Sequence, residues 1–144
     1  MQFSFSTVWA YGYLLYDGGV VVEKTVLIID DDEKLSKMLA FLFMAKGFKV
    51  ESANSGSAAF EVLERIKPSV LILDVMVPGM DGFEVCEKVK DDPSLKGIPV
   101  IILSALSSDK NREKSISLGA YAYFEKPFKS AELVSKAVEA IEAA

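Results

Sequence analysis

Several short apolar stretches of the chain are followed by polar side chains that could take part in phosphoryl chemistry. Three of these side chains are carboxylates, one is a hydroxyl and one is an ammonium group: Asp30, Asp31, Asp74, Ser104 and Lys126. Carboxylates crowded together raise one another's pKa unless a cation lies between them. A hard divalent cation with oxygen ligands, Mg²⁺ above all, would resolve that conflict. The set therefore predicts Mg²⁺-dependent transfer of a phosphoryl group to a carboxylate, with the metal and the ammonium group stabilising the phosphoryl oxygens.

Taken alone, each of these residue types has an ordinary structural role. A single aspartate after a strand is most often a helix N-cap, and Asp32 fits that role here. A lone serine after a strand is commonly a turn or capping residue, and a lone lysine is commonly a solvated charge. The functional interpretation depends on the combination, in which carboxylates follow two stretches, a hydroxyl follows another and a lysine follows the last.

The composition excludes several kinds of function. The 144 residues include no histidine, so the chain cannot supply a Ser-His-Asp or Cys-His catalytic set, an HExxH zinc site or a phosphohistidine of its own. The net charge of −5 disfavours nucleic-acid binding, because phosphate backbones attract basic proteins. The single cysteine cannot form an internal disulfide, which fits a reducing compartment, and we expect a cytoplasmic location.

Alternating strand and helix patterns are expected to bring these polar residues together. Strands are predicted over three continuously apolar stretches and two weaker ones: 26–29, 70–73, 100–103, 49–53 and 120–124. Helical patterns lie between and after them: 33–46, 57–67, 82–91, 109–118 and 130–142. This alternation predicts one parallel α/β sheet, in which ligands lie beyond the carboxyl ends of the strands.

The first predicted helix has apolar residues on two of its faces. Its core face is predicted from helical spacing to consist of Leu35, Met38, Leu39 and Leu42. Ala40, Phe41 and Met44 point to the far side, where polar residues are expected. Large apolar side chains in that position either need a cover or form a docking patch.

Residues 1–23 differ in composition from the rest of the chain and are predicted to be a separate extension. Residues 1–22 contain a single charged side chain, Asp17, and the alternation over 3–15 predicts one extended strand. A turn at 17–19 would then give a β-hairpin. The segment lacks the basic start of a secretory signal, and polar residues interrupt it too often for a membrane span. Either the hairpin buries its aromatic face on the chain's own surface or in a homodimer, or the segment is an appendage without a role.

Four stretches occur in an order and spacing that identify a family: VLIIDDDEKL (26–35), LILDVMVPGMDGFEV (71–85), VIILSAL (100–106) and GAYAYFEKPF (119–128). With them, residues 24–144 strongly resemble the receiver domain of bacterial two-component response regulators, the CheY-like family. The resemblance implies a five-stranded parallel sheet in strand order 2-1-3-4-5, flanked by five helices in a three-layer sandwich.

The resemblance also implies a metal site and a phosphorylation site. Asp74 corresponds to the phosphoaccepting aspartate and is also a Mg²⁺ ligand. Asp31 corresponds to a direct Mg²⁺ ligand and Asp30 to one that acts through water. The backbone carbonyl of Met76, two residues past Asp74, would be a further protein ligand.

Three further residues correspond to the parts of the family's switch. Ser104 matches the hydroxyl that bonds a phosphoryl oxygen, and Lys126 matches the lysine that pairs with the phosphoryl group. Tyr123 matches the aromatic switch position, expected to move inward behind Ser104. The bond between Lys126 and Pro127 is typically cis in this family.

The function that the resemblance implies is signalling by binding rather than catalysis of a turnover reaction. The phosphoryl donor would be a sensor histidine kinase or a histidine phosphotransfer protein, and it must act in trans because this chain has no histidine. Phosphorylation would alter the face within 109–142 and so control a downstream protein target. No output domain follows the last helix, so we expect a stand-alone regulator or a receiver cut from a larger protein.

Two positions depart from the family in a way that bears on the lifetime of the phosphoaspartate. Met76 and Leu106 are apolar where a polar side chain could orient an attacking water.

Two functions other than that of a phosphorylated receiver stay open. One is a pseudo-receiver or flavodoxin-like binding module that is never phosphorylated. The other is a Mg²⁺-dependent aspartyl-phosphate phosphatase of the haloacid-dehalogenase type, although here the nucleophile would follow the third strand of the sheet rather than the first.

Overall fold

The computed structural model describes residues 8–10, 13–16, 19–105 and 109–144, and side chains from residue 24 onward. Five parallel strands form the central sheet: β4 (Thr25–Ile29), β5 (Lys49–Ala53), β6 (Val70–Asp74), β7 (Val100–Ser104) and β8 (Ala122–Glu125). Five helices alternate with them: α1 (Glu33–Ala45), α2 (Gly56–Arg65), α3 (Gly82–Asp91), α4 (Asp109–Ser117) and α5 (Ser130–Ala143). The spatial order β5-β4-β6-β7-β8 confirms the predicted order 2-1-3-4-5.

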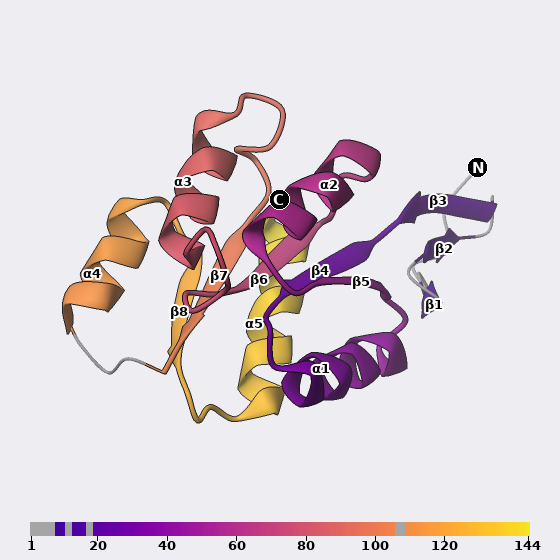
Figure 1. Ribbon diagram of the computed structural model, residues 1–144. Coiled ribbons are helices and arrows are strands. Elements are labelled where there is room, and N and C mark those ends of the chain that lie inside the picture. The colour runs from indigo at the N-terminus through magenta and orange to yellow at the C-terminus, as the bar shows by residue number, and fades with distance from the viewer. Residues whose placement is uncertain (1–7, 11–12, 17–18, 106–108) are drawn as a thin grey trace.

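The helices cover both faces of this sheet. Helices α1 and α5 pack on one face, and α2 and α3 pack on the other (Figure 1). Within β4, Leu27 and Ile29 contribute to the core beneath α2 and α3, whereas Val26 and Ile28 contribute to the core beneath α1 and α5. Because both faces are buried, positions 26–29 of the strand are all apolar, and the sequence shows a continuous run instead of an alternation.

Local capping interactions set the helix boundaries. The Asp32 carboxylate accepts hydrogen bonds from the backbone N–H groups of Lys34 (3.1 Å) and Leu35 (3.2 Å), which confirms Asp32 as the N-cap of α1. Gly47 follows this helix with φ +93°, a left-handed conformation that glycine adopts without strain. The Ser55 hydroxyl accepts from the Ala58 N–H, so α2 begins one residue earlier than predicted.

The core face of α1 differs from the prediction. Leu39 and Phe43 are fully buried, whereas Met38, predicted to face the core, is 43% exposed. Leu35 and Leu42 are half-buried at the margin of the core. Around the helix axis, Met38 and Phe43 lie on opposite sides of Leu39. Which of the two joins Leu39 in the core depends on where the sheet lies against the helix. Of the predicted far-side patch, Phe41 and Met44 are 69% and 55% exposed, which confirms them, whereas Ala40 is half-buried and packs against the core.

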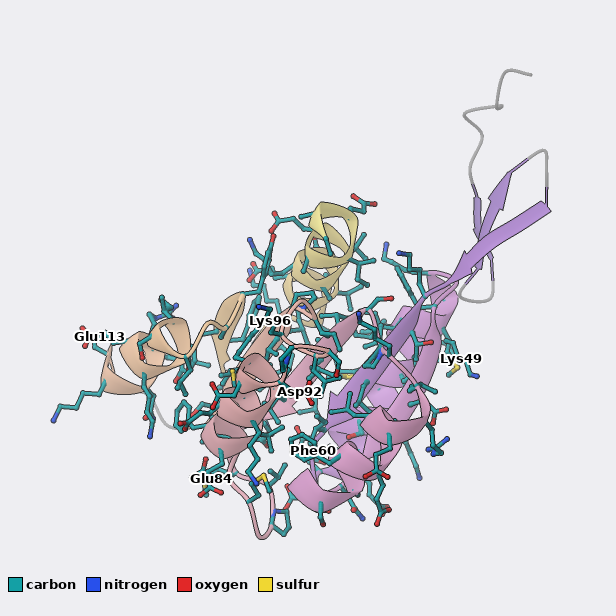
Figure 2. All side chains as sticks on the ribbon, turned by 90° about the horizontal axis from the view of Figure 1, so that it is seen from above. Lys49, Phe60, Glu84, Asp92, Lys96 and Glu113 are labelled. Carbon is teal, nitrogen blue, oxygen red and sulfur yellow. The ribbon has the colours of Figure 1, made fainter. Side chains whose placement is uncertain are left out.

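The N-terminal segment forms a small antiparallel sheet of strands β1 (Val8–Ala10), β2 (Tyr13–Tyr16) and β3 (Gly19–Glu23). The prediction of one strand over 3–15 is wrong, because β1 pairs with β2; residues 1–7, 11–12 and 17–18 lie outside the described residues. An alternating pattern fits one long strand or two shorter ones. When the chain folds back into two strands, the backbone N–H and C=O groups of one strand bond with those of the other. This sheet extends beyond the start of β4, away from the helices (Figures 1 and 2). Its association with a second copy stays a prediction.

In the described part of the chain, all helices are too short or too polar to cross a membrane.

Replacing Leu39 and Met38 by alanine tests the observed orientation of α1. Leu39→Ala removes a fully buried side chain and should lower the free energy of unfolding by about 2–5 kcal/mol. Met38→Ala, one residue away on the same helix, should cost less than about 1 kcal/mol because that side chain is largely solvated. Urea denaturation followed by circular dichroism measures both values. Equal losses for the two variants would contradict the orientation.

Candidate functional site

Three carboxylates converge at the carboxyl ends of two neighbouring strands. Asp30 follows β4 and Asp74 is the last residue of β6, and these strands pair in parallel with Ile29 opposite Leu73. Carboxylate oxygens of Asp30, Asp31 and Asp74 all lie within 4.8 Å of one another. Asp30 and Asp74 are buried, whereas Asp31 is exposed, so the cluster opens to solvent on one side.

Lys126 supplies the positive charge of the cluster. Its Nζ donates hydrogen bonds to Oδ2 of Asp74 at 2.7 Å and to Oδ2 of Asp30 at 3.1 Å. Burial alone would lower the pKa of Lys126, but the hydrogen bond to Asp74 and the attraction of both carboxylates outweigh it and raise that pKa. Lys126 is therefore held as a cation between two buried aspartates.

The charges of the carboxylates are only partly balanced. Burial raises the pKa of Asp30, and the neighbouring charge of Asp74 raises it further, against the lowering effects of the Asp32 N–H and of Lys126. The Asp32 N–H donates to Oδ1 of Asp30 at 2.8 Å, and the Met76 N–H donates to Oδ1 of Asp74 at 2.9 Å. Lys126 contacts only two of the three carboxylates, and oxygen ligands of this kind suit a hard divalent cation such as Mg²⁺. The residues present thus fit the Mg²⁺ site typical of receiver domains.

The hydroxyl and the aromatic residue of the predicted set, Ser104 and Tyr123, lie on β7 and β8, the two strands that follow β6 in the sheet. Ser104 ends β7, one position beyond Leu103, which lies opposite Asp74 in the sheet, and its side chain is fully buried. The Lys126 N–H donates to the Ser104 carbonyl at 2.8 Å, which joins the ends of β7 and β8. Tyr123 lies in β8 and is 7% exposed. The peptide bond between Lys126 and Pro127 is cis, as the resemblance implies.

Two residues that support the site were not singled out from the sequence. A Cβ atom at Gly82 would lie 2.5 Å from the Asp74 carbonyl oxygen, so only glycine lets α3 begin this close to the end of β6. Asp81 directly before the helical pattern, with Gly82 as its first residue, was an available signal. The second residue is Arg112, whose guanidinium carbon lies 5.0 Å from the centre of the Tyr123 ring. No sequence pattern indicates this contact, because it depends on how α4 packs against β8.

Comparison with known proteins agrees with the fold and the acidic cluster. The profile of the family described as "Response regulator receiver domain" matches residues 26–138. The chain is 36% identical over 111 residues to "Response regulator PleD" of Caulobacter vibrioides, covering 77% of this chain and 24% of that protein. The structure resembles the signal receiver domain of a signal transduction histidine kinase from Syntrophus aciditrophicus, with a TM-score of 0.78, 30% identity and coverage of 84% and 92%. It also resembles chemotaxis protein CheY4 of Vibrio cholerae, with a TM-score of 0.75, 26% identity and coverage of 81% and 98%.

The chain therefore belongs to the response regulator receiver domain family, and its fold is CheY-like. A receiver domain is a signalling module rather than an enzyme, and such domains pair with histidine kinases. The chain spans about a quarter to about a half of the length of the curated relatives that it matches.

Removing one buried carboxylate should stabilise the fold. Because burial raises the pKa of Asp30 above its ordinary value of 3.8, the ionised form is disfavoured in the folded protein. Asp30→Asn should therefore increase the free energy of unfolding at pH 7 in the presence of EDTA, and thermal melts measure the change. This gain should shrink as the pH falls through the raised pKa of Asp30, because the wild-type carboxyl then takes up a proton in the folded state.

Asp91→Asn is the matched control, since Asp91 is an exposed aspartate at the end of α3. The control should leave stability at pH 7 unchanged within about 0.5 kcal/mol. A loss of stability in Asp30→Asn at pH 7 would show that its interaction with Lys126 outweighs the cost of burying its charge.

Proposed function

We propose that this domain is a phosphoacceptor in a two-component phosphorelay, phosphorylated on Asp74. The donor is a phosphohistidine of a sensor histidine kinase or of a histidine phosphotransfer protein, acting in trans. The convergence of Asp30, Asp31, Asp74 and Lys126 at one edge of the sheet carries this proposal. The chemistry requires a carboxylate nucleophile next to positive charges that can stabilise phosphoryl oxygens.

The proposed metal site uses four groups of this chain. Asp31 and Asp74 bind Mg²⁺ directly, the backbone carbonyl of Met76 is a third ligand, and Asp30 acts through water. When bound, Mg²⁺ reduces the repulsion between the Asp74 carboxylate and the incoming phosphoryl oxygens. The charge imbalance around Asp30 supports this assignment, because a divalent cation offsets the carboxylates that Lys126 does not balance.

In the proposed reaction an Asp74 carboxylate oxygen attacks phosphorus. The new oxygen–phosphorus bond forms as the phosphorus–nitrogen bond to the donor imidazole breaks, and the electron pair of that bond stays on the nitrogen. Lys126, already 2.7 Å from an Asp74 oxygen, pairs with the transferred phosphoryl group. The Met76 N–H orients the carboxylate through its hydrogen bond to the other oxygen.

Ser104 and Tyr123 form the proposed switch. The Ser104 hydroxyl bonds a phosphoryl oxygen, and the Tyr123 ring occupies the inward position behind it. Ser104 lies one position beyond Leu103, the partner of Asp74, and Tyr123 pairs with Ile102 of the same strand β7. The switch alters the surface built from α4, β8 and α5 and thereby controls binding of a downstream protein, so a single charge change biases the output face.

Phosphorylation by a small-molecule donor tests this function directly. With Mg²⁺ and acetyl phosphate, the wild type should gain the mass of one phosphoryl group in intact mass spectrometry, and EDTA should prevent the gain. Asp74→Asn should abolish it, whereas Asp91→Asn, an exposed aspartate outside the cluster, should leave it unchanged. A wild type that gains no mass would instead support a receiver that acts without phosphorylation. A gain on an acid-stable residue in Asp74→Asn would show that Asp74 is the wrong acceptor.

The phosphoaspartate of this chain should be long-lived for a receiver domain. The Met76 side chain is 58% exposed next to Asp74, and a thioether does not orient an attacking water as a polar group would. Leu106, the second apolar position, lies outside the described residues. The variant Met76→Asn with Leu106→Gln should lose the phosphoryl group faster, as measured by intact mass over time after donor removal. Equal decay in both proteins would contradict the role of these side chains.

A further inference from the structure

Helix α4 differs from the other four helices around the sheet in how little of it is buried. It is built from polar residues except for Ile116, which is 62% exposed. Only Ser115 is buried, and its hydroxyl donates to the Asn111 carbonyl within the same helix. The other four helices each bury three to five residues. Hydrophobic burial therefore contributes little to holding α4 in place.

Two cation–aromatic contacts join α4 to the rest of the domain. The guanidinium carbon of Arg112 lies 5.0 Å from the centre of the Tyr123 ring in β8. The Lys114 Nζ lies 4.5 Å from the centre of the Phe83 ring in α3. Both distances are within the range of an attractive cation–π interaction. Figure 2 shows α4 at the margin of the domain, with Glu113 directed away from it.

The ring beneath Arg112 belongs to the strand that ends at the acidic cluster. Tyr123 lies three residues before Lys126, whose Nζ contacts Asp74 and Asp30. The Lys126 N–H also bonds the carbonyl of Ser104, at the end of the neighbouring strand. A change at Asp74 and a change in the Tyr123 ring therefore act on the same short segment of backbone.

We propose that Arg112 is a positioning residue that holds the Tyr123 ring in its buried place and so couples α4 to the phosphoryl group on Asp74. This inference rests on the proposed function, in which the inward ring accompanies phosphorylation. The contact with Arg112 occurs with the ring 7% exposed, so it stabilises that inward arrangement. Because coupling between two sites is reciprocal, a contact that favours the inward ring also favours phosphoryl binding if phosphoryl binding favours the inward ring.

Binding of beryllofluoride, a stable analogue of the phosphoryl group, measures this coupling. The affinity is determined in the presence of Mg²⁺ by ¹⁹F nuclear magnetic resonance, for the wild type and for Arg112→Met. The variant should bind beryllofluoride roughly two- to fivefold more weakly, the size expected for loss of one exposed cation–π contact. Arg112→Lys keeps a cation near the ring and should recover part of the loss.

Lys110→Met is the matched control, because it removes one positive charge from the same helix. Lys110 is exposed and contacts no aromatic ring in the described part of the chain, and the two methionine substitutions alter helix propensity similarly. The control should bind beryllofluoride with the affinity of the wild type. Equal affinities of Arg112→Met and Lys110→Met, or tighter binding by Arg112→Met, would overturn the inference.

Hydrogen exchange separates coupling from a merely structural effect. Coupling predicts that beryllofluoride slows amide exchange within 109–117 in the wild type and slows it less in Arg112→Met. A structural role alone would speed exchange by the same factor in the free and bound forms, and that result would also overturn the inference. A wild type that binds beryllofluoride while Arg112→Met behaves identically would leave the proposed function intact. A wild type that binds none would overturn both proposals.

Discussion

Repulsion among three carboxylates is the physical constraint around which this domain is built. Asp30 and Asp74 are buried at the ends of adjacent strands, Asp31 lies beside them, and the Lys126 ammonium group contacts the two buried carboxylates. Burial disfavours the ionised form of Asp30, while Lys126 favours it. The cluster therefore costs stability in the absence of further positive charge. The same imbalance suits the cluster to a divalent cation with oxygen ligands.

The sheet provides the rigidity that this crowding needs. Both faces of its central strands are buried, and backbone pairing fixes Asp74 opposite Leu103 and next to Ser104 in register. Gly82 lets α3 begin against the backbone at Asp74, where a Cβ atom would collide. A small displacement of any strand end would separate the charges, so the apolar core holds groups together that would otherwise move apart.

Helix α4, at the margin of the domain, is held less firmly than the sheet. Helix α4 has little buried surface and is joined to the domain by Arg112 on Tyr123 and by Lys114 on Phe83. Elements with few apolar contacts open at low free energy, and conformational changes draw on such elements. A rigid acidic cluster beside a weakly attached helix is thus suited to convert one local charge change into a change of surface, without rearrangement of the core.

The sequence by itself determined the strands, the helices and the acidic set, because strand ends in a parallel sheet lie at one edge and carry Asp30, Asp74 and Ser104 there. It placed Met38 in the core of α1, where the structure has Phe43, because only the position of the sheet selects which residues beside Leu39 are buried. It did not determine that the aromatic alternation in the N-terminal segment folds back into β1 and β2. Nor did it indicate Arg112, whose contact with Tyr123 exists only where α4 meets β8. Local patterns report periodicity and chain order, whereas these choices depend on which surfaces meet in three dimensions.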